Sequence, residues 1–172
     1  MIETLAHSSA ATNNMLKNYV VCPGILYGCG EDFFYKYFKK AWLMDPWELP
    51  IIGPGKNSIP TIHILDLIAL LERIIYSLPK QQYIFAVDRT KDRSLRNIIG
   101  SISKGTGNGT VKHFPETQSY SDDEIPNALD LLINIKVKTS KIFDDEKLDD
   151  EEEEDFEKRK FKWHCEVIKT IH

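Results

Sequence analysis

The sequence predicts an α/β protein built on a mostly parallel sheet. Short apolar runs rich in β-branched residues alternate with longer segments whose apolar residues recur at helical spacing. Such alternation is typical of βαβ units, in which helices cover a parallel sheet. The chain has 172 residues, which is enough for one domain with a modest core.

The first predicted elements are a strand and a helix. Residues 18–22 form an apolar run that Pro23-Gly24 ends, as expected for a buried strand followed by a turn. A helix is predicted over residues 33–43, because its apolar side chains follow helical spacing and its lysines lie on the other side. Asp32 is expected to cap this helix.

The middle of the chain predicts two extended segments and a long amphipathic helix. Residues 49–52 are expected to form a strand, and residues 59–63 to be extended because Pro60 restricts the residue before it. Residues 65–78 present a wide apolar face, so they should form a helix that packs against a sheet. Pro79 is expected to end that helix.

Three further elements follow along the chain. Residues 83–87 are expected to form another buried strand, and Ser94 to cap a helix that continues to about residue 103. The glycine-rich stretch at residues 105–109 follows this helix, and it therefore predicts a helix C-cap and turn. Residues 110–114 are the last expected strand.

The C-terminal part predicts a different organisation. Residues 125–141 are interpreted as one more helix, so the chain divides into an α/β part at 1–120, a helical extension at 121–143 and a tail at 144–172. The tail begins with eleven acidic residues within 144–157 and continues into a basic, aromatic segment. The acidic run is interpreted as a solvated tail or as a contact for basic partners.

Composition excludes several classes of function. Residues 1–143 are close to neutral at a net charge of +2, so no basic face for nucleic acid is expected. No apolar run approaches the ~18 residues needed to cross a bilayer, and the N-terminus lacks the pattern of a signal peptide. The three cysteines and the scattered histidines do not form a zinc-ligand pattern, so we expect no metal and a reducing compartment.

The stretch from Gly53 to Ser58 superficially resembles a phosphate-binding loop. Such a loop needs a longer glycine spacing, Ser or Thr after its Lys, and a helix that begins at once. Here Asn57 follows Gly55-Lys56, and Pro60 imposes an extended chain. We therefore interpret this stretch as a surface loop between two strands.

The order of the motifs resembles the C-terminal half of the extended short-chain dehydrogenase/reductases, the NAD-dependent epimerase/dehydratase group. The match covers roughly residues 16–115. It rests on the sequences "YVVCPGILYGCGEDFF" and "LPIIGPGKNSIPTIHILDLIALLERIIYSLPKQQYIFAVD". The resemblance implies an incomplete Rossmann-like parallel sheet with flanking helices, in which residues 1–120 are one half of the domain.

A narrower resemblance is to the epimerase-like region ahead of the kinase domain in a ciliary adenylate kinase. It rests on "FFYKYFKKAWL", "ISKGTGNGTVKHFP" and the late "FKWHCE". This resemblance implies a cytoplasmic protein of the cilium, with other axonemal proteins as partners in a large complex. It also implies a scaffold role beside any catalysis.

The epimerase resemblance assigns two pairs of candidate site residues. Pro23 and Gly24 match the position that touches the nicotinamide amide, and His63 and Asp66 match a region that borders the substrate. Each pair has a plain structural alternative. Pro23-Gly24 is then a strand-ending turn, and Asp66 stabilises the positive end of a helix.

Two features of that family are missing from this chain. There is no glycine-rich turn after a first strand, and no Tyr-x-x-x-Lys pair ahead of Pro23-Gly24. The alignment places Met1 just past the family's catalytic Lys, so the chain is expected to correspond to the middle of a larger architecture. We therefore predict no catalytic residue and no cofactor for this chain alone, an exposed sheet edge, and apolar helix faces that pair with another chain.

Two alternative functions remain open. The first is an NAD-dependent epimerase or reductase half-domain that another chain completes. The second is a segment of an adenylate kinase involved in axonemal nucleotide homeostasis.

Overall fold

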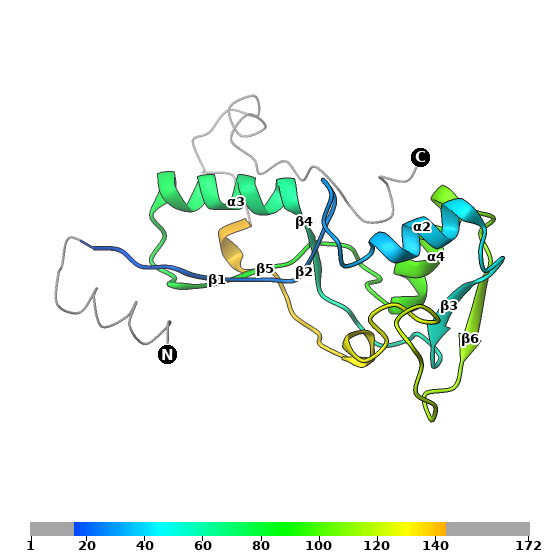
Figure 1. Cartoon of the computed structure of the whole chain (residues 1–172). Helices are drawn as coiled ribbons and strands as arrows, with labels where there is room; N and C mark the ends of the chain where they lie inside the picture. The colour runs from blue at the N-terminus through cyan, green and yellow to red at the C-terminus, as the bar shows by residue number, and fades with distance from the viewer. Residues whose placement is uncertain (1–15, 144–172) are drawn as a thin grey trace.

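The computed structural model describes residues 16–143 (Figure 1). In chain order the elements are β1 (Val20–Pro23), β2 (Ile25–Tyr27), α2 (Tyr35–Leu43), β3 (Leu49–Ile52), β4 (Thr61–His63), α3 (Ile64–Ser77), β5 (Tyr83–Ala86), α4 (Leu95–Thr106), β6 (Val111–Phe114), and the 3₁₀ helices η1 (Asp130–Leu132) and η2 (Lys141–Phe143). No helix in this part of the chain has the length and apolar character needed to span a bilayer.

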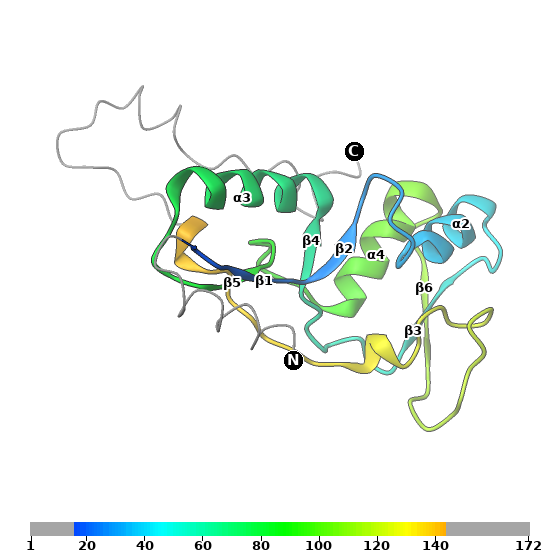
Figure 2. The same cartoon turned by 60° about the vertical axis from the view of Figure 1, so that its left-hand side comes forward.

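The strands pair in parallel, as predicted. β1 pairs with β5, β2 with β4 and β3 with β6. α3 lies over β1 and β5 at one end of the molecule, while α2 and α4 lie with β3 and β6 at the other end (Figures 1 and 2). The α/β class and the incomplete Rossmann-like arrangement are therefore confirmed.

The strands form three two-stranded sheets instead of one continuous sheet. The division begins between β1 and β2, where two adjacent residues bond to different strands. The Gly24 N–H donates to the Ala86 carbonyl at 2.9 Å, whereas the Ile25 N–H donates to the Pro60 carbonyl at 2.8 Å. The chain therefore changes partner strand within one residue, which prevents β1 and β2 from continuing as a single strand.

β2 is absent from the predicted elements. It has only three residues, and both of its flanking positions, Gly24 and Gly28, are glycines. A strand this short has little local preference and depends on its partner for stability. Pairing of Tyr27 with His63 in the β2–β4 register supplies that partner.

Each end of the molecule has its own apolar cluster. The larger cluster joins α2, α4 and β3, and its fully buried members include Tyr37, Leu49, Ile51, Leu95 and Ile99. The smaller cluster joins α3 to β4 and β5 through Ile62, Leu70, Ile74, Ile84 and Ala86. The amphipathic helix predicted over 65–78 therefore packs against strands, as expected.

The predicted helix caps have different outcomes. Ser94 caps α4 as predicted, because its Oγ accepts the Asn97 N–H at 3.2 Å. The prediction for Asp32 is wrong, since α2 begins at Tyr35 without a side-chain cap. Asp32 contributes only its backbone carbonyl, which accepts the Tyr35 N–H at 3.0 Å. Phe34, the residue before the helix, is buried in the larger cluster.

The helix predicted over residues 125–141 is also wrong. This part of the chain contains η1 and otherwise has no helix until η2 begins at Lys141. Residues 133–140 have no regular secondary structure. The range 121–143 is therefore not a helical extension.

Tertiary hydrogen bonds explain why this segment stays extended. The Ile135 N–H donates to the Ser58 carbonyl at 2.9 Å, and the Ser140 N–H donates to the Phe85 carbonyl at 3.0 Å. The Ser140 Oγ in turn accepts the Phe85 N–H at 2.9 Å. These bonds use backbone groups that a helix would need for itself, so the segment runs along the body of the molecule.

Candidate functional site

Pro23 and Gly24 lie at the carboxyl end of β1, where parallel α/β sheets commonly bind ligands. In this chain the backbone of Pro60 and Thr61 lies directly against Gly24. A Cβ added to Gly24 would lie 2.7 Å from the carbonyl carbon and oxygen of Pro60 and 2.8 Å from the Thr61 nitrogen. Gly24 is therefore required for the close approach of two backbone segments, which agrees with its interpretation as a structural turn.

His63 lies at the end of β4 and caps α3. Its Nδ1 accepts the Leu65 N–H at 3.2 Å, and its side chain is largely buried. The ring stands edge-on to Tyr27, with 5.1 Å between the ring centroids. It also lies against Gly28, where an added Cβ would come within 2.1 Å of the His63 Nε2. The imidazole is therefore enclosed by β2 and its turn.

Asp66 is fully buried in the first turn of α3. A carboxylate at this position interacts favourably with the positive end of the helix dipole. The structure therefore brings His63 and Asp66 together at one helix N-terminus. Gly24 lies against the start of β4, at Thr61, which is two residues before His63.

A buried polar group next to these residues was missed by sequence reasoning. The Thr61 Oγ1 donates to the Asp88 Oδ2 at 2.6 Å, and the Asp88 N–H donates to the Thr61 carbonyl at 2.8 Å. Burial raises the pKa of Asp88, while the hydrogen bonds from Thr61 and Thr90 oppose that rise. The signal for this group was an acid directly after the apolar run "YIFAV", which ends a buried strand.

The loop from Gly53 to Ser58 caps a helix and does not have the geometry of a phosphate loop. Its Asn57 and Gly55 carbonyls accept the N–H groups of Leu95 at 3.0 Å and Arg96 at 2.9 Å. A phosphate loop presents N–H donors to the anion, whereas this loop presents carbonyl acceptors to the start of α4. The interpretation as a non-phosphate loop is therefore confirmed by its geometry.

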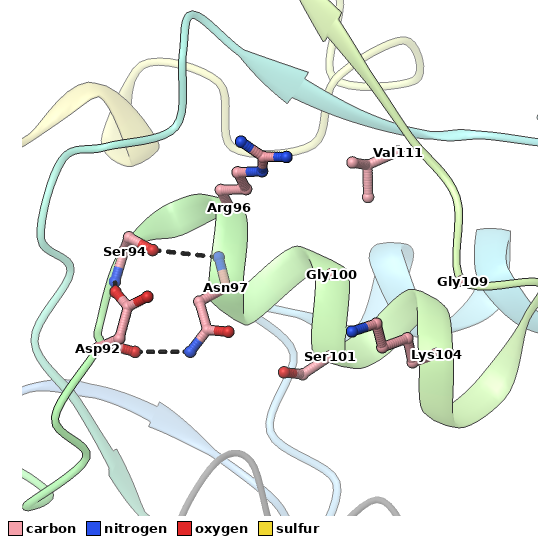
Figure 3. Close-up of a pocket in the computed structure, with 9 residues that line it drawn as sticks. All are labelled: Asp92, Ser94, Arg96, Asn97, Gly100, Ser101, Lys104, Gly109 and Val111. Carbon is pink, nitrogen blue, oxygen red and sulfur yellow. Dashed lines mark hydrogen bonds between the residues drawn. The ribbon is translucent and has the colours of Figure 1, made fainter.

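A concavity of about 430 Å³ lies along α4 (Figure 3). At its N-terminal end, the Asp92 carboxylate accepts the Ser94 N–H at 3.0 Å, and the Asn97 Nδ2 donates to the Asp92 carbonyl at 2.7 Å. Arg96 lies in the first turn of α4 and Lys104 near its C-terminal end, on either side of Gly100 along the helix. The polar groups of Asp92, Ser94 and Asn97 serve the helix start, so Arg96, Ser101 and Lys104 are the remaining polar side chains that line the concavity.

The arrangement of these groups limits the chemistry of the described residues. None of the concavities that we describe is lined by Pro23, Gly24, His63 or Asp66. Within residues 16–143 there is no group of three or more His, Cys, Asp or Glu side chains placed to hold a metal ion. The contacts described for Gly24, His63 and Asp66 are those of close packing and of a helix start.

Comparison with known proteins links the chain to a kinase. No family model matches the sequence. Over 122 residues it is 38% identical to adenylate kinase 7 from Macaca fascicularis and 36% identical to adenylate kinase 7 from Mus musculus. The matched part covers 70% of this chain in both cases, but only 23% and 20% of the two relatives.

This similarity confirms the predicted relationship to an adenylate kinase, whereas the epimerase resemblance stays a prediction. The chain spans about a quarter or less of the length of these relatives, so their activity as whole proteins is not transferred to it. The chain is thus related by sequence to one segment of adenylate kinase 7.

Proposed function

We propose that the chain is a non-catalytic, epimerase-like interaction module of a ciliary axonemal complex. The observation that carries the proposal is the close packing of the chain against itself at the carboxyl ends of β1 and β4. Gly24 lies against the Pro60–Thr61 backbone, and the His63 ring lies against Gly28. Both pairs of candidate residues are therefore packed against other parts of the chain, which supports a structural role for them.

An exposed apolar face of α3 supports the interaction role. Leu65, Ile68, Leu71 and Ile75 recur at helical spacing, and their exposed fractions range from 40% to 68%. The opposite face of the same helix carries the buried residues Leu70 and Ile74. Exposed apolar side chains gathered on one side of a helix in this way are characteristic of surfaces that bind another protein.

Calorimetric titration with NAD and with AMP tests the non-catalytic part of the proposal. We expect no saturable heat for either ligand with the chain alone. Tight one-to-one binding of NAD would favour the epimerase half-domain. Tight binding of AMP would favour a segment that takes part in adenylate kinase chemistry, an alternative to which the similarity to adenylate kinase 7 gives support.

The interaction role is tested in ciliated cells with a tagged chain. We expect the native chain to remain with detergent-extracted axonemes, and the I68D/I75D variant to be released, because the two charges interrupt the apolar face. Lys39 and Lys80 are exposed and lie outside α3, so K39D/K80D is the matched control and should be retained. Release of the native chain, or equal retention of all three chains, would contradict the proposal.

A further inference from the structure

Three adjoining concavities surround the N-terminal half of α4. Their volumes are about 430, 490 and 350 Å³. The first two share Arg96, the last two share Lys56, and the first and third share Asp92 and Ser94. Because neighbouring concavities share lining residues, they form one continuous surface.

This surface is strongly basic. Seven cationic side chains line it, and we call them the basic surface: Lys56, Lys91, Arg93, Arg96, Lys104, Lys136 and Lys138. The acid that lines it is Asp92, whose carboxylate already accepts the Ser94 N–H. A net charge of +2 over residues 1–143 thus conceals a local concentration of positive charge.

The lysines of the basic surface are not neutralised by the rest of the fold. The two ion pairs described within residues 16–143 both involve Lys36, which does not line this surface. The backbone that carries two of the lysines is held in place, because the Arg93 Nη2 donates to the Val137 carbonyl at 2.7 Å. The fold therefore fixes seven cations close together, whereas the carboxylates described near them are fewer: Asp92, Asp88 beside Arg93, and Glu116 beside Gly53.

The sequence carries a concentration of negative charge shortly after Lys138. Eleven acidic residues lie within 144–157, and Lys138 precedes the first of them, Asp144, by six positions. We propose that residues 144–157 dock on the basic surface of their own chain and cover it. A segment tethered this closely acts at an effective concentration in the millimolar range, which many weak surface ion pairs can exploit together.

The docked run has a consequence for other chains. While it covers the basic surface, acidic segments of other proteins are excluded from the same cations. Salt weakens the contact, since charges at a protein surface are screened within about 8 Å at physiological ionic strength. The proposal is independent of the interaction role of α3, which uses a different face.

Amine labelling followed by mass spectrometry tests the proposal on the full chain. An ammonium group beside carboxylates stays protonated, so it reacts more slowly with reagents that attack the neutral amine. We expect Lys56, Lys136 and Lys138 to be labelled about threefold or more slowly than in a chain whose eleven acids at 144–157 are changed to Asn and Gln. Lys39 and Lys80 are exposed lysines outside the basic surface, and their rates should not change.

Two further conditions make the outcome decisive. The protection should disappear in about 1 M NaCl, where the screening length is about 3 Å. It should also be lost at Lys56 in the K136E/K138E variant but kept in the matched K39E/K80E variant. Equal labelling of native and neutralised chains, an equal change at Lys39 and Lys80, or protection that grows with protein concentration would each overturn docking within one chain.

Discussion

Gly28 has a backbone φ of +89° and lies directly against the His63 ring. Replacing it with Ala should therefore cause two separate penalties. The left-handed backbone costs a residue with a Cβ about 1–3 kcal/mol. The new methyl group would also lie 2.1 Å from the His63 Nε2 and 2.4 Å from its Cδ2, and such overpacking costs about another 1–3 kcal/mol.

Gly30 provides a matched control for the first penalty. Its φ is +92°, and an added Cβ would meet nothing within 4 Å. G30A should therefore lower the free energy of unfolding by the backbone term alone, and G28A by about 1–3 kcal/mol more. Equilibrium urea unfolding followed by circular dichroism measures both variants.

A double-mutant cycle with H63A isolates the steric part. His63 supplies the three ring atoms nearest to the added methyl group, so removing the ring should make G28A about as costly as G30A. The reasoning would be refuted if G28A and G30A were equally destabilising in the native chain. It would also fail if H63A left the extra cost of G28A unchanged, since His63 would then not enclose the position.

Three smaller predictions use the same unfolding assay. S94A should destabilise the chain by about 1 kcal/mol, because the Ser94 Oγ no longer accepts the Asn97 N–H; a change below the error of the measurement would contradict the cap. G100A should stabilise it by about 0.5–1 kcal/mol, because Gly100 lies within α4 and an added Cβ meets nothing within 4 Å; a loss of stability would show a contact that the structure lacks. Burial raises the pKa of Asp88 above its ordinary value of 3.8. The stability that the protonated carboxyl contributes is therefore fully present below about pH 3.8, and it is lost as the pH rises through the raised pKa. D88N cannot ionise, so its stability relative to the native chain should rise as the pH is raised above about 4, and a difference that stays constant with pH would refute the assignment.

Much of the fold could be predicted because its signals are local. Helix α3 was recognisable from apolar residues at helical spacing, and Ser94 from the preference of hydroxyl side chains for helix starts. Pro60 and Asn57 were enough to exclude a phosphate loop, since each affects its own position in the chain. The parallel pairing followed from the alternation of these local elements.

Other features could not be predicted, because distant residues decide them. The helix expected over residues 125–141 overlooked the alternating run "INIKVKTS" at residues 133–140, whose period of two favours an extended chain. What the sequence does not show is the course of this segment, which is set by its hydrogen bonds to Ser58 and Phe85 far away in the sequence. The cap expected at Asp32 also failed, since the helix begins at Tyr35, directly after Phe34, which is buried in the larger cluster.

The candidate site shows the same division. The sequence by itself determined which residues to examine, since a Pro-Gly strand end and a His–Asp pair before a helix are visible in the letters. Only the tertiary structure decided what they do, because Gly24 meets the Pro60 backbone and His63 meets Gly28 across strands that are separate in sequence. It likewise gathered Lys56, Lys91 and Lys136 onto one surface, although the near-neutral charge of residues 1–143 gave no sign of it. Composition reports how many charges a chain carries, whereas folding determines which of them share a surface.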